Sequence, residues 1–569
     1  MKTSNRHRQN SRENPLSDVS AGARFCHVAR RSTEDKKDRR EEEIIWRISY
    51  PEYCELSSLV MAYLGRCFIT VLALKYCQAG MFVMLPSIGK SHFLLFTRLS
   101  EELIRRGHEV QIVVGDTESY VTSHQNVRIY KTPQLLYQIM LTRRGPKKGL
   151  DVVTETASTS KLMAMYCEGI LNDEELTTDI QHADVVIGDG LYICSSLIAS
   201  KFSLLHIVVV SSTLSLPAML AFGVPLTPSY VPQFKSTFAD DLSFVERLQN
   251  IYYWILVHWA FNYGMVPPFH DLKKRYNITP QETVYETLGR VDLIISQKPF
   301  ILEYPRPLFP NTKVVGPLLA APAKPLQEDL EEFIQKSGNE GVILVSFGTV
   351  MGNINENMST LLVNAFSRVS QRIIWKLVRE STKVELSNNI KVASWLPQND
   401  ILGHNKTKLF INHGGGHGLM EAAYHGVPMI CAPFFGDQYD NAYIAKRKGF
   451  AEVVNLDTIT ADELVDIINR VISNQSYRES AVRLSKFVKL LPRSPVQEAV
   501  DWIEYTHAVN GLPHLRPRCL DLPFYKLYLL DVLLVAIIMC AILWFSLKYL
   551  CSRWLEMKRN WFTDKDKKL

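Results

Sequence analysis

The 569-residue sequence lacks the short motifs and compositional extremes that identify several large classes of protein. It has no Gly-x-Ser-x-Gly pentapeptide, which excludes the nucleophile elbow of a serine hydrolase. Its ten cysteines form no Cys-x-x-Cys pair in the body of the chain, so neither a zinc ribbon nor a disulfide scaffold is expected. A net charge of +6 is small for this length, and part of it lies at the extreme C-terminus. Nucleic acid is therefore not an expected partner.

Two common nucleotide-binding motifs are also missing. The Gly-x-Gly-x-x-Gly pattern fails in "NHGGGHGLMEA" (Asn412–Ala422), because the sixth position counted from Gly414 is Leu419. The segment "IGKSH" (Ile88–His92) is not a phosphate-binding P-loop, because Met84 stands where the first glycine is required. We therefore expect neither an NAD site nor an ATP site of these types.

What the chain does contain is an alternation of short apolar runs and helical patterns. Runs such as "HEVQIVVG" and "GVILVSFGT" are typical of buried parallel strands. We predict an α/β fold with two facing Rossmann-like domains, residues 80–305 and 306–520, and a Pro-rich linker at 304–326. The first helix is expected to be capped by Ser91 and to end at Gly107. Ligands of such folds bind at the carboxyl ends of the strands.

One apolar run near the C-terminus is long enough to cross a membrane. Residues 527–547 contain a single charged residue, Asp531, and a helix needs about 20 apolar residues to span a bilayer. The tail that follows, residues 548–569, is rich in lysine and arginine, which predicts a cytosolic location. A transmembrane helix is therefore favoured over a buried core helix. The final "KDKKL" resembles a dilysine retrieval signal of endoplasmic reticulum membrane proteins.

A second membrane signal precedes the body of the chain. Residues 61–79 combine an arginine, an apolar run and small residues, which is the pattern of a signal peptide. The hydrophilic leader, residues 1–60, is unusual before such a signal, and translation from Met61 would remove it from the protein. Together the two signals predict a single-pass type I protein of the endoplasmic reticulum membrane with a luminal body. Four glycosylation sequons are compatible with that location: Asn277, Asn357, Asn405 and Asn474.

The glycine-rich segment after residue 411 suits a phosphate better than a metal ion. His413 and His417 are separated by three glycines, which are unfavourable inside a helix, and no third ligand stands at a recognisable spacing. The same glycines follow an apolar strand that ends at Asn412 and precede a helical pattern. Glycine lets backbone N–H groups approach a phosphate, and a helix N-terminus adds a favourable dipole. We predict a nucleotide-diphosphate site.

The longer stretch "WLPQNDILGHNKTKLFINHGGGHGLMEAAYHGVPMICAPFFGDQYDNA" (Trp395–Ala442) resembles the signature of the UDP-glycosyltransferases, most closely their animal, glucuronosyltransferase-type branch. The resemblance extends from about Met81 to the C-terminal tail and includes the single membrane span. It implies the two-domain GT-B fold, with the acceptor bound by the first domain and the UDP-sugar by the second.

The resemblance also implies a set of UDP-sugar-binding residues. Trp395 would stack on uracil, and Glu421 would accept both ribose hydroxyls. Asp437 and Gln438 would bind the sugar hydroxyls. The remaining members would lie beside the base or line the phosphates: Ser346, Gly348, Thr349, Gln398, His413, Gly414, Gly415 and Gly416. Many animal members carry Thr-Asn where this chain has Gly416-His417, which removes a hydroxyl and an amide near the phosphates or sugar.

Two residues of the first domain match the family's catalytic pair. His92 would remove the proton of the acceptor hydroxyl, and Asp189 would orient and stabilise the imidazolium. Direct displacement would then invert the α-linked sugar to a β-glycoside. The Asp-x-Asp motif at Asp564–Asp566 lies in the expected cytosolic tail, so no metal is expected, and the UDP-sugar is a co-substrate rather than a bound cofactor.

The predicted function is transfer of a sugar, with glucuronic acid favoured, from a UDP-sugar to a small lipophilic hydroxyl compound. A UDP-glucose-dependent enzyme and a non-catalytic sugar-nucleotide or lipid-binding relative are the alternatives. The aromatic segment at residues 251–269 is interpreted as a core helix, with an acceptor pocket or a membrane contact as the other interpretations. A homo-oligomer is compatible with the sequence.

Overall fold

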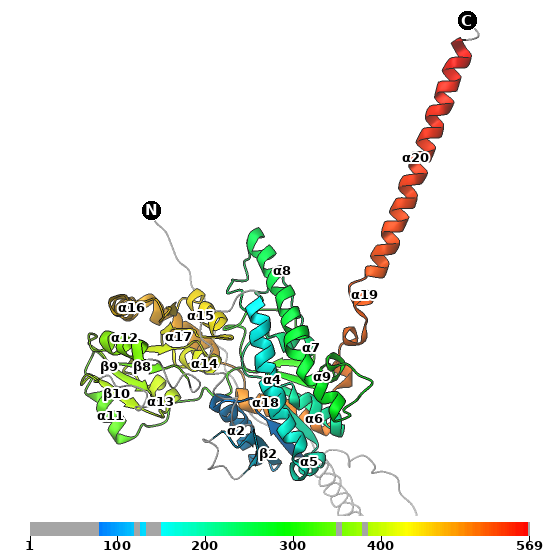
Figure 1. Cartoon of the computed structure of the whole chain (residues 1–569). Helices are drawn as coiled ribbons and strands as arrows, with labels where there is room; N and C mark the ends of the chain where they lie inside the picture. The colour runs from blue at the N-terminus through cyan, green and yellow to red at the C-terminus, as the bar shows by residue number, and fades with distance from the viewer. Residues whose placement is uncertain (1–78, 119–125, 133–149, 349–355, 378–384, 567–569) are drawn as a thin grey trace, which may run out of the picture. The chain divides into compact units, whose positions relative to one another are not determined.

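The computed structural model describes residues 79–118, 126–132, 150–348, 356–377 and 385–566. The expected leader and almost all of the expected signal peptide lie outside these residues. The described part contains two sheets of parallel strands, and helices alternate with the strands along the chain (Figure 1). The predicted α/β class with two Rossmann-like domains is confirmed.

The first sheet has seven strands in the order β3-β2-β1-β4-β5-β6-β7, and every neighbouring pair is parallel. Alternate residues of β1 enter two different cores, Phe82 and Met84 on one face and Val83 and Leu85 on the other. Burial on both faces explains why these strands are continuous apolar runs. The strands are β1 (Met81–Leu85), β2 (Glu109–Gly115), β3 (Val127–Tyr130), β4 (Val185–Asp189), β5 (Leu205–Val210), β6 (Leu293–Ser296) and β7 (Thr312–Val314).

Helices connect the strands of this first domain. They are α2 (Lys90–Arg105), α4 (Leu150–Asn172), α5 (Glu174–Gln181), α6 (Cys194–Phe202), α7 (Pro217–Ala221), α8 (Phe244–Trp259), the π-helix η1 (Ala260–Met265), α9 (Val266–Arg275) and α10 (Val284–Leu288).

The second sheet has six parallel strands in the order β10-β9-β8-β11-β12-β13. The strands are β8 (Val342–Ser346), β9 (Arg372–Lys376), β10 (Ile390–Ala393), β11 (Thr407–Asn412), β12 (Met429–Cys431) and β13 (Ala451–Val453). The accompanying helices are α11 (Glu328–Gln335), α12 (Glu356–Phe366), α13 (Gln398–Gly403), α14 (Gly416–His425), α15 (Gln438–Arg447), α16 (Ala461–Ser473) and α17 (Gln475–Lys489).

The division between the two sheets differs from the expected boundary at residues 305 and 306. Strand β7 lies inside the Pro-rich segment 304–326, yet it pairs with β6 and completes the first sheet. After α17 the chain returns to the first domain, where α18 (Pro495–Ala508) packs against α2 and β6. The proline content thus concealed a three-residue strand, and residues 495–508 belong by their packing to the first domain.

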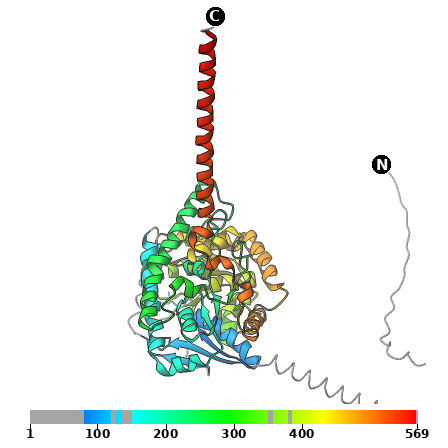
Figure 2. The same cartoon turned by 90° about the vertical axis from the view of Figure 1, so that its right-hand side faces the viewer.

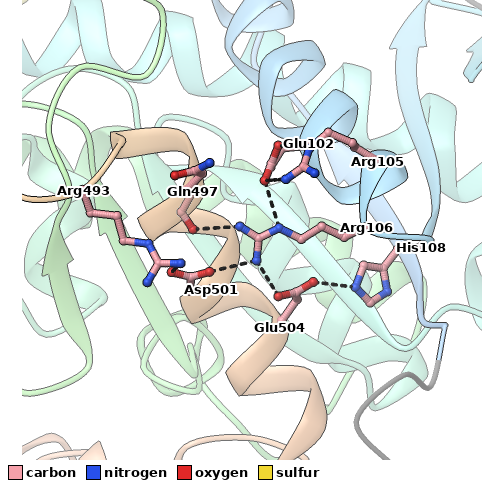
Figure 3. Close-up of polar contacts among 8 residues, drawn as sticks. All are labelled: Glu102, Arg105, Arg106, His108, Arg493, Gln497, Asp501 and Glu504. Carbon is pink, nitrogen blue, oxygen red and sulfur yellow. Dashed lines mark hydrogen bonds and ion pairs between the residues drawn. The ribbon is translucent and has the colours of Figure 1, made fainter. Parts of the chain in front are cut away.

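A network of charged side chains holds α18 against α2 (Figure 3). The Arg106 guanidinium, which follows α2, donates to Asp501 at 2.8 Å and to Glu504 at 2.7 Å. It also donates to Glu102 of α2 at 2.9 Å. His108 lies 3.0 Å from Glu504, so the carboxylates of α18 are paired with side chains from two parts of the first domain.

The ends of α2 are set by glycine. The N-cap is Gly89, whose φ of 121° and ψ of 139° are unfavourable for other residues, and the helix begins at Lys90. The expected cap, Ser91, is therefore wrong, because it lies inside the first turn. Gly107, with φ of 93°, follows the end of the helix as expected.

One disulfide bond links α4 to α6. It joins Cys167 and Cys194, which are 27 residues apart and completely buried in the core of the first domain. The cysteine spacing contained no signal for this pair, because α4 and α6 are brought together only by the fold.

The C-terminal part of the chain ends in one long helix. Two short 3-10 helices (Pro513–Leu515 and Arg518–Asp521) and α19 (Phe524–Leu527) lead into α20 (Leu530–Asp566), which Figure 2 shows as an unbroken helix. Its segment Leu530–Trp561 is long and apolar enough to cross a membrane, and none of its most apolar part is buried in the protein. The helix starts three residues after the expected position 527, and the basic tail continues it.

Candidate active site

The candidate site lies at the points where the strand order of each sheet reverses. In the first sheet this point lies between β1 and β4, and in the second between β8 and β11. His92 follows β1, and Asp189 is the last residue of β4. Ser346 ends β8 beside Asn412 at the end of β11. Open parallel sheets bind ligands at such positions, because the loops diverge there and leave a crevice.

A glycine turn leads from β11 into α14. The N–H of Gly414 donates to the Asn412 side chain at 2.6 Å, and α14 begins at Gly416 with Gly415 as its N-cap. The φ of Gly414 is 77°, and an added Cβ would lie 2.6 Å from the carbonyl oxygen of Gln438. The turn thus requires glycine, and the first N–H groups of α14 are available to an anion.

The His413 ring packs between two glycines. A Cβ added to Gly348 would lie 2.8 Å from its Nε2 atom, and one added to Gly415 would lie 2.5 Å from that atom. Burial lowers the pKa of His413 to about 4, so the ring is neutral at physiological pH. Its Nδ1 atom is buried without a hydrogen-bond partner among the described residues. The ring therefore offers a polar atom that a ligand can satisfy.

A partly buried pair joins Glu421, one turn into α14, to Gln398 of α13. The amide of Gln398 donates to Glu421 at 2.5 Å, and Gln398 is the first residue of α13. Burial raises the pKa of Glu421 to about 7. Gln398 and Glu421 are two of the residues implied for the nucleoside, and the fold brings them together.

Two lysines, neither of them predicted from the sequence, place their ammonium groups over the ring of Trp395. Its side chain is 49% exposed, and the Lys90 ammonium lies 3.3 Å from the ring centroid. Lys376, at the end of β9, lies 5.0 Å from the same centroid. Burial, together with the charge of Lys90, lowers the pKa of Lys376 to about 8. Lys90 comes from the first domain, so this contact crosses between the domains; no motif in the sequence predicted it.

Asp437 and Gln438 start α15 and have different partners. Asp437 accepts hydrogen bonds from Asn441 at 2.8 Å and from the hydroxyl of Ser212, a residue of the first domain. Gln438 accepts from the N–H groups of the preceding turn, Phe434 at 2.9 Å and Phe435 at 3.2 Å. The side-chain oxygen Oε1 of Gln438 thus fixes the turn that presents Asp437.

A buried lysine supports this arrangement from the first domain. The Lys298 ammonium is 1% exposed and donates to Asn441 at 2.7 Å. Asn441 in turn donates to Asp437, so a cation of one domain orients a carboxylate of the other through one amide. Lys298 and Ser212 could not be recognised from the sequence, because both lie outside the quoted motif and more than 80 residues from Asp437. Asn441 lies inside the motif, four residues after Asp437, and had not been assigned a role.

His92 and Asp189 form a close pair. The Nδ1 atom of His92 lies 2.6 Å from Oδ2 of Asp189, and the aspartate is fully buried. The other oxygen of Asp189 accepts from the N–H of Leu191 at 2.9 Å. Burial lowers the pKa of His92, but the charge and hydrogen bond of Asp189 outweigh it and the net shift is upward from 6.5. A carboxylate on Nδ1 leaves Nε2 as the atom that can accept a proton.

Glu118, three residues after the end of β2, adds a second carboxyl near this pair. It is 8% exposed, and the N–H of Gly89, the N-cap of the helix that carries His92, hydrogen bonds to it. Burial raises the pKa of Glu118 to about 7. No motif in the sequence marked this residue.

His417 lies close to the His92–Asp189 pair and follows the glycine turn. Its ring centroid is 6.0 Å from that of His92, with the rings perpendicular. The Gln297 amide nitrogen donates to the Ser211 carbonyl at 2.7 Å and lies 2.9 Å from Nε2 of His417. The second amide hydrogen is therefore donated to Nε2, which leaves the ring proton on Nδ1. Burial lowers the pKa of His417 to about 3, so the ring is neutral.

The fold thus gathers nearly all the predicted site residues on the facing ends of two sheets. Thr349 lies outside the described residues. Among the described residues no group of three or more histidine, cysteine, aspartate or glutamate side chains could hold a metal ion. The arrangement can bind a nucleotide diphosphate at α14 and place a base, His92, beside it.

The two facing Rossmann-like domains, with the His92–Asp189 pair in the first and the glycine turn of α14 in the second, define a glycosyltransferase of the GT-B type. The glycosyltransferase VinC, solved in complex with DTDP, superimposes with a TM-score of 0.51 at 17% identity, over 76% of this chain and 100% of that one. A UDP-glucosyltransferase from Polygonum tinctorium gives 0.51 at 16% identity, over 76% and 99% of the two chains. At such identities the likeness concerns the fold.

Sequence comparison identifies the family. A family model described as "UDP-glucoronosyl and UDP-glucosyl transferase" matches residues 82–560. UDP-glucuronosyltransferase 2C1 of Oryctolagus cuniculus is 33% identical over 487 residues, which are 81% of this chain and 95% of the relative. UDP-glucuronosyltransferase 2A2 of Homo sapiens is 32% identical over 479 residues, 80% and 88% of the two chains. The chain belongs to the UDP-glycosyltransferase family.

Proposed function

We propose that this enzyme transfers glucuronic acid from UDP-glucuronate to a hydroxyl of a small lipophilic acceptor, with inversion at the sugar. The observation that carries the proposal is the 2.6 Å pair of His92 and Asp189, which stands beside the N-terminal end of α14. The glucuronic acid donor is supported by the relatives, which are named UDP-glucuronosyltransferases.

In the proposed reaction the acceptor oxygen is the nucleophile. Nε2 of His92 takes the proton of the acceptor hydroxyl while the oxygen forms a bond to the anomeric carbon of the sugar. The bond between that carbon and the β-phosphate oxygen breaks, and UDP leaves with the electron pair. Asp189 stabilises the imidazolium that forms, in the way the carboxylate of a catalytic triad does. Attack opposite the leaving group converts the α-linkage of the donor to a β-glycoside.

The second domain binds the donor in this proposal. Trp395 stacks on uracil, and Glu421, held by Gln398, accepts the ribose hydroxyls. The diphosphate is bound by the glycine turn and the first N–H groups of α14, which stabilise the charge that develops on the leaving group. The remaining roles are assigned as the motif implies: Ser346, Gly348, Thr349 and His413 to Gly416 at the phosphates, and Asp437 and Gln438 at the sugar.

Three features support a luminal body anchored in the endoplasmic reticulum membrane. The helix α20 is long and apolar enough to span the bilayer. The disulfide between Cys167 and Cys194 is a bond that forms and persists in oxidising compartments. The asparagines of the four sequons, at residues 277, 357, 405 and 474, are exposed.

The function is tested with the full chain purified in detergent. UDP-glucuronate or UDP-glucose is supplied with a phenol, and the product is identified by mass spectrometry. We expect a glucuronide of β configuration, and a loss of about 10²–10⁴-fold in kcat for His92→Ala. His182→Ala is the matched control, since His182 is exposed and precedes the amino end of β4, whereas Asp189 lies at the carboxyl end of that strand. Turnover of His92→Ala at the rate of the control would rule out the assigned base. Glucoside as the main product would assign UDP-glucose as the donor.

A further inference from the structure

A small cavity, of about 20 Å³, lies beside the start of α2 in the first domain. The segment after β1, the end of β2 and four aromatic side chains form its wall. The aromatic side chains are Phe93, Tyr130, Tyr166 and Tyr192. Ile88 is the only lining residue that is not buried, so it marks the mouth, four residues before His92. The cavity therefore opens beside the base, at the edge where the carboxyl ends of β1 and β2 meet.

Glu118 supplies the one carboxyl of this cavity, and no lysine, arginine or histidine is among the lining residues. The side chain is 8% exposed, and its Oε1 atom is buried without a hydrogen-bond partner among the described residues. A buried polar atom without a partner costs free energy, and burial raises the pKa of Glu118 to about 7. Such an atom in a cavity wall offers a binding position to a hydrogen-bond donor.

The size of the cavity limits the ligand to one small polar group. A water molecule needs about 10–15 Å³ of such space, so this volume admits one group of similar size. A hydroxyl and a primary ammonium both fit. The wall favours the ammonium, because a carboxylate binds a cation more strongly than a neutral donor and aromatic rings attract a cation. A bound ammonium would also keep Glu118 ionised.

We propose that this cavity is an acceptor subsite for a primary ammonium group, with Glu118 as its partner. The enzyme then favours phenols or alcohols with an aminoalkyl chain, whose hydroxyl lies at His92 while the amine reaches Glu118. The two residues are close enough for the charge of Glu118 to contribute to the raised pKa of His92, so one small molecule can contact both. The inference rests on the proposed function, which it narrows to a defined class of acceptor.

Three phenols that differ only at the end of one side chain test this subsite. Tyramine ends in an ammonium, tyrosol in a hydroxyl and p-propylphenol in a methyl group. Their Kd values are measured by calorimetric titration of the full chain in detergent at about pH 8, above the pKa of Glu118. Glu118→Gln removes the charge and keeps the shape. The matched control is Glu109→Gln, which changes an exposed carboxyl at the amino end of β2.

We expect Glu118→Gln to weaken the binding of tyramine by about 10–100-fold, the range for a hydrogen bond between charged groups. The Kd values of tyrosol and p-propylphenol are expected to stay nearly constant. The control variant is expected to bind all three phenols as the parent does. Partition of the phenols into detergent is the same for the three proteins and cancels when they are compared.

An equal loss of binding for all three phenols would overturn the proposal, because it would show damage to the pocket rather than loss of a charge. Tyramine binding to Glu118→Gln with the Kd of the control would also overturn it. A loss confined to tyrosol would overturn it in favour of a hydroxyl ligand. The titrations need no UDP-sugar, so absence of turnover of all three phenols with UDP-glucuronate would contradict the proposed function while the Kd values still decide on the subsite.

Discussion

The pKa of His92 is the outcome of two opposing influences. Burial favours the neutral imidazole, and the carboxylate of Asp189, 2.6 Å away, favours the imidazolium. Burial is the largest single influence, but the charge and hydrogen bond of Asp189, together with the charges of Asp437 and Glu118, outweigh it, so the net pKa lies above 6.5. A base must be unprotonated to act, and the rate is therefore expected to rise with pH through this raised pKa and to reach a plateau above it.

Asp189→Asn removes the charge and keeps the shape. The pKa of His92 then falls, so the rising limb of the pH profile moves to lower pH, while kcat on the plateau decreases by about 10²–10⁴-fold because the imidazolium is no longer stabilised. The measurement is kcat against pH for the variant and the parent enzyme. A rising limb at the same pH in both would contradict the assigned role of Asp189.

A single substitution can test whether His417 contributes to the choice of sugar donor. Many animal members of the family have asparagine at this position, and here a neutral ring accepts from Gln297 instead. His417→Asn restores an amide that can donate to the donor's anionic groups, and one such hydrogen bond corresponds to about 10–100-fold in affinity. We expect kcat/KM for UDP-glucuronate to rise relative to UDP-glucose. An unchanged ratio of the two kcat/KM values would remove His417 from donor selection.

At the scale of elements, α4 and α6 are joined by the Cys167–Cys194 bond, which closes a segment of 27 residues. The closed loop restricts the unfolded chain, and a loop of this size corresponds to about 3–4 kcal/mol of stability. Replacing both cysteines with alanine is expected to lower the Tm of the full chain in detergent. The matched control is Cys519→Ala, a free cysteine outside the core. A Tm equal to that of the control would show that the bond adds no stability.

At the scale of the whole molecule, the chain passes through the second domain and then returns to the first, where Arg106 binds the returning helix α18. The guanidinium pairs with Glu102, Asp501 and Glu504, and its side chain is only 17% exposed. Arg106→Gln leaves three carboxylates close together without their cation. We expect the free energy of unfolding to fall by about 1–3 kcal/mol. Thermal unfolding of the full chain measures this loss. Arg98→Gln, which breaks an exposed pair with Glu101, is expected to have almost no effect. Equal Tm values for the two variants would contradict the role of Arg106.

The elements of each domain could be predicted from the sequence, whereas the contacts between the two domains could not. Both sheets were predictable, because strands buried on two faces must be continuous apolar runs and β1 or β8 is such a run. The pairing of His92 with Asp189 was implied by the resemblance to the family, and the two side chains do lie 2.6 Å apart. The contacts of Lys90 with Trp395 and of Ser212 with Asp437 did not, since they join residues more than 200 positions apart and depend on how two domains meet. Strand β7 was hidden because three residues between prolines carry no periodicity.

The lysine on Trp395 has a consequence for the order of events in a catalytic cycle. Its ammonium lies 3.3 Å from the ring centroid, which is the space that a stacked base would fill on that face. On the proposed stacking of uracil, the base and the Lys90 ammonium compete for one side of the indole. Lys90 is the first residue of α2 in the first domain, whereas Trp395 belongs to the second. Nucleotide binding to the second domain would then release a side chain of the first domain from its contact with the ring.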